Sequence, residues 1–394
     1  MPFAEIVGHE LNVRLLQQAL RAGRVPPAYL FSGAERLGKA SVALAWAQAV
    51  NCQAPQDSEA CGECRSCRAI TRGAHPDVRL VRPEASRVQS RESRVEGREI
   101  GSEDPESRVS GSIDGQGSEV SLEGTVLRTE QVLELVRDAH LRPVWGPHKV
   151  YILDRAEAMN EASANRLLKT LEEPPGQTTF ILVSAQPGRL LPTIHSRCQE
   201  IRFGPIPAPA LAQGLQRRFP DSNTALVQAL AATSAGRFGW AQEMLQHPEL
   251  RQVRQQWLEL LASLPNREPF EALRLAKATT DLAQAWWLGR MGEEGQEALK
   301  RSPDRVLRAQ AGELLELALT WYRDLLLLSS NGRNGEDLLV NQDLRKLLEE
   351  CSRQASGEQA GRHAAAVQQQ RQYILFGNAN LRLALEVLFL RLLK

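Results

Sequence analysis

The 394-residue sequence predicts an α/β domain followed by an all-helical region. Two apolar runs, KVYILD (149–154) and TTFILVSA (178–185), have the length and unbroken hydrophobicity of buried parallel strands. Helical patterns separate them from each other and from an earlier strand pattern, which is typical of a doubly wound sheet. After FGPIPAP, near residue 205, strand patterns stop and helical periodicity continues to the C-terminus.

The first eighty residues alternate helical and strand patterns. Apolar residues at helical spacing predict a helix over 9–23. The run AYLFSG (28–33) is the first expected strand, and SVALAWAQAV (41–50) is expected to form the helix after it. A glycine-bearing loop lies between this strand and this helix, which is the context that a phosphate-binding loop requires.

The segment 84–124 interrupts this order. It has ten acidic and five basic residues, nine Ser, six Gly and no aromatic residue. It buries too little apolar surface to offset its ordering entropy, so we expect a flexible insertion. The pattern TEQVLELVRDAHL (129–141) then predicts an amphipathic helix. A further helix over 162–171 should end before Pro174, because proline cannot continue it.

Composition and charge narrow the class of protein. Lys and Arg number 48 against 47 for Asp and Glu, a formal net charge of +1, which argues against a protein that coats nucleic acid through bulk charge. No run reaches the roughly 18 apolar residues that span a bilayer. The N-terminal MPFAEIVGHE lacks the pattern of a secretory signal. We therefore expect a cytoplasmic protein without a membrane partner.

Four of the six cysteines lie close together in the sequence. They follow the spacing C-x8-C-x2-C-x2-C and are Cys52, Cys61, Cys64 and Cys67. Four thiolates close a tetrahedral shell around Zn²⁺ with no open position, so the spacing predicts a structural zinc site. Gly62 permits the turn between the ligands, and His75 is interpreted as a loop residue that the shell does not need.

The loop GAERLGKAS, from Gly33 to Ser41, has the spacing of a phosphate-binding P-loop. In such a loop, backbone N–H groups up to Gly38 and the N-terminus of the next helix hold phosphate oxygens, and Lys39 reaches the terminal phosphates. The pattern requires Ser or Thr directly after the lysine to hold Mg²⁺, but Ala40 stands there. Ser41 is one residue late and, on a helix, points about 100° away.

A second acidic element is also incomplete. Asp154 ends the run KVYILD, where an ATPase places the Asp that organises Mg²⁺. The next residue would be a Glu that orients the attacking water, but this chain has Arg155, with Glu157 two positions further on. A cation cannot act as a general base. Two outcomes stay open: a loop that holds ATP or ADP without hydrolysing it, and a turn of P-loop shape that binds nucleotide poorly or not at all.

Several motifs occur in a fixed order along the chain. They are the P-loop, the four-cysteine group, AHPD (74–77), NRLLKTLEEPP (165–175) and the SRC triplet (196–198). This ordered set resembles the clamp-loader subunits of bacterial DNA polymerase III, within the AAA+ superfamily. The motifs that carry the resemblance lie within residues 1–83 and 125–205. Over the helical remainder only the architecture is similar.

The resemblance implies an AAA+ type architecture. A doubly wound P-loop α/β domain would occupy 1–204, with a zinc-binding module at 52–67 and the flexible insertion at 84–124. A small helical lid domain would follow at 205–249. An all-helical collar domain, which in this family holds the subunit ring together, would occupy 250–394.

Two kinds of subunit in this family have such a fold. The gamma/tau subunits are the ATP-hydrolysing motors, whereas delta-prime subunits usually lack a working hydrolysis site. This chain departs from the motor pattern at Ala40 and Arg155. It departs again at Gly239, where motors have an arginine that contacts the nucleotide; Arg237 is two positions early. These departures favour the delta-prime type.

The resemblance also implies partners and a role for the SRC triplet. Its Arg197 would act in trans on ATP held by a neighbouring gamma/tau subunit. The implied partners are gamma/tau and delta subunits, with the sliding clamp and primer–template DNA reached through the complex. One alternative is a gamma/tau-type motor in which Ser41 supplies the missing magnesium ligand. Another is a zinc-containing nucleic-acid-binding module unrelated to clamp loading, which the balanced charge disfavours.

Overall fold

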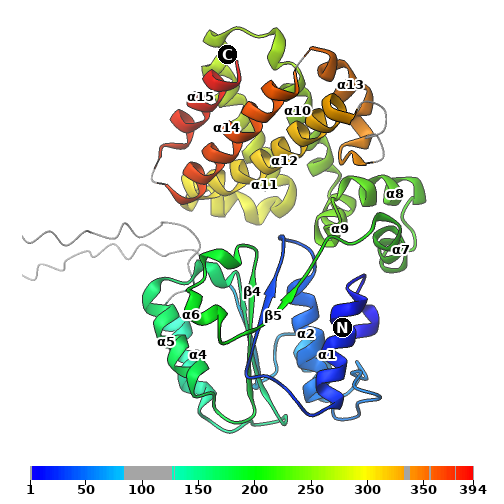
Figure 1. Ribbon diagram of the computed structural model, residues 1–394, viewed down its shortest axis with the longest axis vertical. Helices are drawn as coiled ribbons and strands as arrows, with labels where there is room; N and C mark the ends of the chain where they lie inside the picture. The colour runs from blue at the N-terminus through cyan, green and yellow to red at the C-terminus, as the bar shows by residue number, and fades with distance from the viewer. Residues whose placement is uncertain are drawn as a thin grey trace, which may run out of the picture.

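A computed structural model of the chain describes residues 2–83, 127, 129–331, 338–354, 356–377 and 379–393. The segment 84–124, which we expected to be a flexible insertion, lies outside these residues. The described part consists of an α/β portion and a helical portion, and the chain passes from the first to the second after the last strand (Figure 1). The fold class expected from the sequence is therefore confirmed at this level.

The α/β portion is built on a parallel sheet. Its strands run in the order β2-β3-β4-β1-β5, and each neighbouring pair is parallel. The strands are β1 (Ala28–Ser32), β2 (Val78–Val81), β3 (Lys149–Asp154), β4 (Thr178–Ser184) and β5 (Gln199–Arg202). The first strand therefore lies inside the sheet, between the two strands that come last in the sequence.

Three strands expected from the sequence are confirmed, and two were missed. β1 and β4 are buried at every residue and β3 at all but its last, as continuous apolar runs predict. β2 and β5 are short strands at the two edges of the sheet. Each carries an exposed arginine, Arg79 or Arg202, because an edge strand is only partly covered. These charges hid both strands from a search for apolar runs.

Helices cover both faces of the sheet, so the doubly wound arrangement is confirmed (Figure 1). On β1, Tyr29 and Phe31 face the cluster under α1, α2 and α3, and Ala28 and Leu30 face the cluster under α4, α5 and α6. This alternation follows from the two-residue period of a strand. The helices are α1 (Glu10–Arg21), α2 (Lys39–Asn51), α3 (Arg65–Thr71), α4 (Thr129–Ala139), α5 (Glu161–Glu172) and α6 (Pro192–His195).

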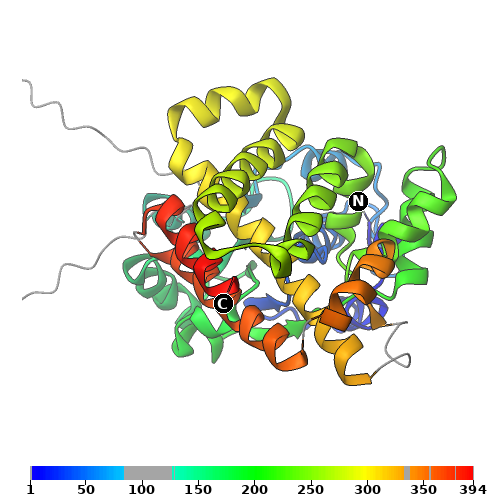
Figure 2. The ribbon, with the colours of Figure 1, turned by 90° about the horizontal axis from the view of Figure 1, so that it is seen from above.

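The helices of the helical portion, which Figure 2 shows from above, share one continuous apolar core. Its helices are α7 (Ala208–Arg218), α8 (Thr224–Thr233), α9 (Phe238–Gln246), α10 (Pro248–Ala262), α11 (Ala272–Arg301), α12 (Pro303–Asn331), α13 (Arg345–Gln354), α14 (Gly357–Phe376) and α15 (Leu381–Leu392). The helix α11 bends at Gly292, whose φ of +58° favours glycine. None of the helices in the described ranges combines the length and apolar character that crossing a bilayer requires.

A glycine-bearing break separates α8 from α9. Gly236 has a φ of +77°, and a Cβ atom there would collide with Pro205 and the backbone nitrogen of Ile206. The break is thus packed against the segment that leaves β5. Because α7 to α15 share one core, the boundary expected between 249 and 250 stays a prediction.

Candidate functional site

The P-loop follows the carboxyl end of β1, in the middle of the sheet. In parallel sheets ligands bind beyond the carboxyl ends of the strands, where the strand order reverses. Gly33 has a φ of +141°, and a Cβ atom there would collide with the carbonyl oxygen of Phe203. Gly38 has a φ of +95° and caps α2. Both glycines of the motif are therefore required by the backbone, and the loop lies between a strand and a helix, as the sequence predicted.

Lys39 is buried at the start of α2 and is held by its own loop. Its Nζ atom donates to the carbonyl oxygens of Gly33 and Ala34, both at 2.6 Å. Burial lowers the pKa of Lys39, and the carboxylates of Glu35, Glu157 and Asp154 partly oppose this shift. Two of the three N–H donors of the ammonium are thus engaged by the loop, and one is left for a phosphate.

Ser41 lies in the first turn of α2, one residue after Ala40. It lines a small cavity of about 40 Å³ together with Ile6, His9, Leu37 and Phe238, among other residues. That volume is far below the roughly 300–1,000 Å³ of small-molecule sites. Ser41 faces this cavity from α2. This position does not favour Ser41 as a substitute for the magnesium-binding Ser or Thr that a motor subunit has at position 40.

Asp154 and Arg155 lie beside the P-loop, at the end of β3. The Asp154 carboxylate accepts from the backbone N–H of Arg155 at 3.1 Å and faces Arg82 at 3.5 Å. Arg155 has a φ of +53°, and its guanidinium is about half exposed and lies 3.4 Å from Glu35 of the loop. A cation therefore occupies the position at which a motor presents its glutamate.

Glu157 is turned toward the end of β4. Its Oε1 atom accepts from the backbone N–H of Ala185 at 3.1 Å, while its Oε2 atom is buried and has no hydrogen-bond partner among the described residues. This carboxylate joins the ends of β3 and β4 and adds negative charge near Lys39. Its position three residues after Asp154 distinguishes the site from the Asp-Glu sequence that the motor pattern requires.

Helix α9 contacts the loop at Gly239. Its backbone N–H donates to the carbonyl oxygen of Arg36 at 2.9 Å. A Cβ atom at Gly239 would lie only 3.3 Å from the Cβ and carbonyl oxygen of Arg36. An arginine at 239 would therefore press on the P-loop, so the glycine at this position is accounted for by close packing of α9 on the loop.

Arg36 also joins the P-loop to the helical portion through an ion-pair cluster. Its Nη1 atom lies 2.6 Å from Glu243 of α9, and its Nη2 atom lies 2.9 Å from Glu313 of α12. Arg290 of α11 pairs with both glutamates, at 2.7 Å to Glu313. We call Arg36, Glu243, Arg290 and Glu313 the Arg36 cluster. Sequence analysis missed it, because its members come from four separate segments and each alone is typical of a surface charge.

The electrostatics of the Arg36 cluster are those of a desolvated network. All four side chains are 16–27% exposed. Burial alone would raise the pKa of Glu313, but the charges of Arg36 and Arg290 hold it at about 2. Burial likewise opposes the charge of Arg290, yet the two glutamates raise its pKa.

Arg237, which lies two positions before the place of the motor arginine, is also committed elsewhere. Its Nη1 atom lies 2.6 Å from Glu316 of α12, and Glu316 also accepts from Arg371 of α14 at 3.1 Å. The side chain is only 12% exposed. Arg237 thus points into the helical portion, and its pairing with α12 is independent of the P-loop.

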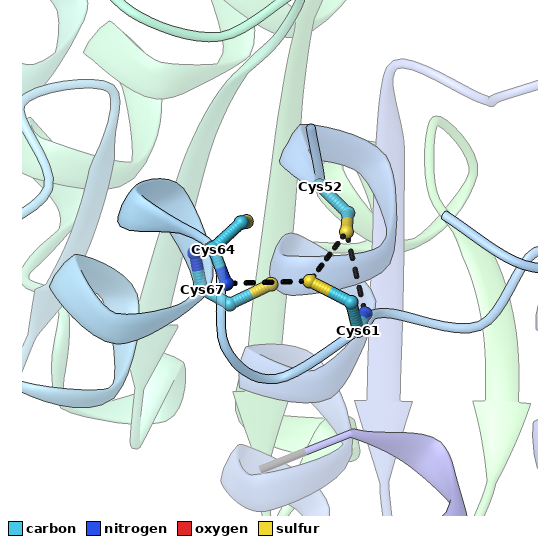
Figure 3. A group of neighbouring side chains, drawn as sticks. All are labelled: Cys52, Cys61, Cys64 and Cys67. Atoms are coloured by element: carbon cyan, nitrogen blue, oxygen red, sulfur yellow. Dashed lines mark hydrogen bonds between the residues drawn. The ribbon is translucent and has the colours of Figure 1, made fainter. Parts of the chain in front are cut away.

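The four cysteines converge in space, as their spacing predicted (Figure 3). Cys52 caps the C-terminus of α2, Cys64 caps the N-terminus of α3, and Cys67 lies in the first turn of α3. All four Sγ atoms lie within 4.8 Å of one another, and those of Cys52 and Cys61 are 3.5 Å apart. A tetrahedral zinc site with Zn–S bonds of ~2.3 Å has sulfurs about 3.8 Å apart, so the group can hold such an ion.

Backbone N–H groups donate to three of the four sulfurs. Cys61, Cys64 and Cys67 donate their N–H groups to the preceding cysteine sulfurs at 3.3–3.4 Å. Burial opposes ionisation of Cys64, but the donors around it lower its pKa to about 6. Gly62 has a φ of +76°, so the turn expected at this glycine is confirmed.

His75 and Asp77, from the AHPD motif, fasten this module to the α/β portion. His75 is a buried loop residue whose Nε2 lies 2.9 Å from Ser66 Oγ, and it is not part of the cysteine group. The Asp77 carboxylate accepts from the backbone N–H groups of Val144, Trp145 and Gly146 at 2.7–3.0 Å. These bonds lower the pKa of Asp77 against the effect of burial. The motif is therefore structural in this chain.

Replacing Cys64 with Ser should release a bound zinc ion and loosen the region around α3, because a hydroxyl is a far poorer zinc ligand than a thiolate. Elemental analysis of the purified protein measures the metal, and hydrogen exchange measures the loosening. Cys351→Ser, a buried cysteine outside the group, is the control and should retain the metal. Wild-type protein purified without metal would contradict the zinc assignment.

Arg197 lies at the surface directly after α6. Its Nη1 atom donates to the carbonyl oxygen of Thr193 at 3.0 Å, and its Nη2 atom lies 2.7 Å from Glu172 Oε1. The side chain is 35% exposed. Arg197 is therefore accessible at the surface of the chain, and its role as a finger stays a prediction.

Comparison with known proteins shows to which family this chain, with its P-loop, four-cysteine group and SRC triplet, belongs. A family model described as DNA polymerase III, delta subunit, matches residues 8–207. The DNA polymerase III subunit delta' of Escherichia coli is 30% identical over 287 residues, which are 73% of each chain. The chain belongs to the DNA polymerase III subunit delta' family. The delta' subunit of Bacillus subtilis extends the match to 96% of this chain, at 25% identity.

Other comparisons place this delta' family member among related subunits. The delta' subunit of Pseudomonas aeruginosa is 34% identical over 260 residues, which span 65% of its own length. The tau/gamma subunit of Haemophilus influenzae is 30% identical over 58% of this chain, and the match spans 28% of that longer protein. A solved mutant of RuvB from Thermotoga maritima covers 75% of this chain and 88% of its own, at 14% identity and a TM-score of 0.37. So distant a likeness has no bearing on the site.

Proposed function

We propose that this chain is a clamp-loader subunit that does not hydrolyse ATP itself and that donates Arg197 in trans to a neighbouring gamma/tau subunit. In that role it helps the assembled complex load the sliding clamp onto primed DNA. The observation that carries the proposal is a P-loop of regular shape beside an incomplete hydrolysis site. Family membership supports the role as a clamp-loader subunit. The geometry of the site supports the proposal that this chain leaves ATP hydrolysis to the gamma/tau subunits.

Three features of the site support the loss of hydrolysis. Ala40 stands where a motor has its magnesium ligand, and Arg155 stands where a motor has its catalytic glutamate. At the third position, Gly239 lies so close to Arg36 that a larger side chain would press on the loop. Lys39 remains, but its ammonium is bonded to loop carbonyls. The arrangement leaves room for a structural role of the loop without nucleotide turnover.

The proposed partners are gamma/tau and delta subunits in a ring, with the clamp and primer–template DNA bound through the complex. An AAA+ type lid over 205–249 and a collar over 250–394 are part of this proposal. The surface of α15 supports the collar, because Leu383, Val387 and Leu390 are exposed on one face of this helix. Such a stripe fits a helix–helix interface between subunits.

ATP turnover by the purified chain, alone and mixed with gamma/tau and delta subunits on primed DNA, tests the proposal. We expect no turnover by the chain alone, because both the magnesium ligand and the base are replaced. We expect DNA-stimulated turnover in the mixture to require this chain.

Two results would overturn it. Turnover by the chain alone that is lost in Lys39→Ala would show a gamma/tau-type motor. Tight DNA binding by the chain alone, with a steep dependence on salt, would instead show a zinc-containing nucleic-acid-binding module.

A further inference from the structure

Arg197 is held from two sides by its own chain. Thr193 supplies a backbone carbonyl from the short helix α6, and Glu172 supplies a carboxylate from the last turn of α5. The hydrogen bond to Thr193 and the ion pair with Glu172 involve different nitrogens, so together they restrict the position of the guanidinium. A guanidinium has five N–H donors, and these two contacts leave others for an anion outside the chain.

We propose that Glu172 is a positioning residue that presents Arg197 to the phosphates bound by the neighbouring subunit. This inference rests on the proposed function of Arg197. An unrestrained arginine loses rotamer freedom when it binds, and a contact that orders it beforehand lowers that cost. Glu172 provides the contact at 2.7 Å from a surface position that is half exposed, so the pair stays accessible to a partner.

The adjacent glutamate makes the assignment specific. Glu173 follows Glu172 directly, lies at the C-terminal cap of α5 and is exposed. The ion pair with Arg197 is formed by Glu172. Two neighbouring carboxylates with the same charge therefore differ in their contact with Arg197. Comparing variants at the two positions separates a positioning effect from the general effect of negative charge near the interface.

The test uses the reconstituted complex and five variants of this chain, one of which is Arg197→Ala. Glu172→Ala should lower the DNA-stimulated kcat about 2- to 5-fold, the size of an exposed ion pair, with KM for ATP unchanged. Glu172→Gln should retain most of the activity, because its carbonyl oxygen can still accept from Arg197. Glu173→Ala is the control for charge and should behave as wild type. Glu172→Ala combined with Arg197→Ala should be no slower than Arg197→Ala alone.

Each outcome bears on a different claim. If Glu172→Ala turns over ATP as fast as wild type, Glu172 has no positioning role. If Glu172→Ala is faster than wild type, Glu172 restrains the arginine, and the positioning role is likewise overturned. Equal loss in Glu172→Ala and Glu173→Ala would also overturn it. If Arg197→Ala itself turns over ATP as fast as wild type, the proposed function of Arg197 fails instead. Gel filtration of each complex checks that assembly is unchanged.

Discussion

Arg197→Ala should lower ATP turnover by on the order of 10³-fold at the one nucleotide site that this chain is proposed to serve. The physical reason is that a guanidinium stabilises charge developing on the phosphoryl group during transfer, and alanine cannot replace it. Because Arg197 is at the surface and bonds only at the periphery of α5 and α6, the fold and the assembly should be unaffected. Single-turnover kinetics of the reconstituted complex, which resolve one site from the others, provide the measurement.

The matched control is Arg166→Ala, an exposed arginine on α5. It removes the same charge from the helix that packs beside α6, so general electrostatic weakening of the interface would appear in both variants. Arg197→Lys adds a second test, since lysine keeps the charge but lacks the planar fork. Turnover that survives in Arg197→Ala, or that falls equally in Arg166→Ala, would argue against a finger.

Glu313→Ala should reduce the free energy of unfolding by about 2–4 kcal/mol, near the cost of breaking a buried ion pair but reduced by partial exposure. Glu313 accepts from Arg36, Arg290 and the Trp286 indole, at 2.7–3.1 Å. Alanine would leave two largely buried guanidinium groups with less compensating charge. Urea denaturation measures the loss, and hydrogen exchange of the P-loop should rise with it.

Lowering the pH should show, in the wild-type protein, that the free energy of unfolding depends on the charge of Glu313. The Glu313 carboxyl has a pKa of about 2 in the folded chain against an ordinary value of 4.5. Its contribution to stability is therefore complete above about pH 4.5 and is lost as the pH falls toward 2. Glu313→Gln, which carries no charge, should show a shallower decline over that range.

Glu297→Ala is the control for Glu313. Glu297 forms an i,i+4 pair with Arg301 on α11, and both side chains are more than 70% exposed. Removing a pair of this kind changes stability little. A loss in Glu313→Ala no larger than in Glu297→Ala would show that the Arg36 cluster contributes nothing beyond a surface ion pair.

The predictable part of the fold was the part with local signals. The strands β3 and β4 are continuous apolar runs because both of their faces are covered, and their order along the chain indicated the doubly wound sheet. The edge strand β5 has the sequence QEIR and buries only Ile201, so nothing local marked it as a strand. Its identity depends on pairing with β1, which lies far away in the sequence.

The same distinction applies to the site. The cysteine group was predictable because all four ligands lie in one short segment, and Gly33, Gly38 and Lys39 because the P-loop is a local motif. The Arg36 cluster was not predictable, since Glu243, Arg290 and Glu313 come from three helices of the helical portion. Glu172 likewise gained its meaning only when α5 and α6 brought it to Arg197.

The compactness of the cysteine group also determines when in synthesis it can form. Its ligands are separated by short loops, which close quickly and at little entropic cost. β1, in contrast, must wait for β4 and β5, so the sheet cannot be completed until Arg202 has left the ribosome. A nascent chain that ends before β3 already contains all four sulfurs of the cysteine group. If the group binds zinc, it can do so first and hold α2 and α3 together while the strands that will flank β1 are still being made.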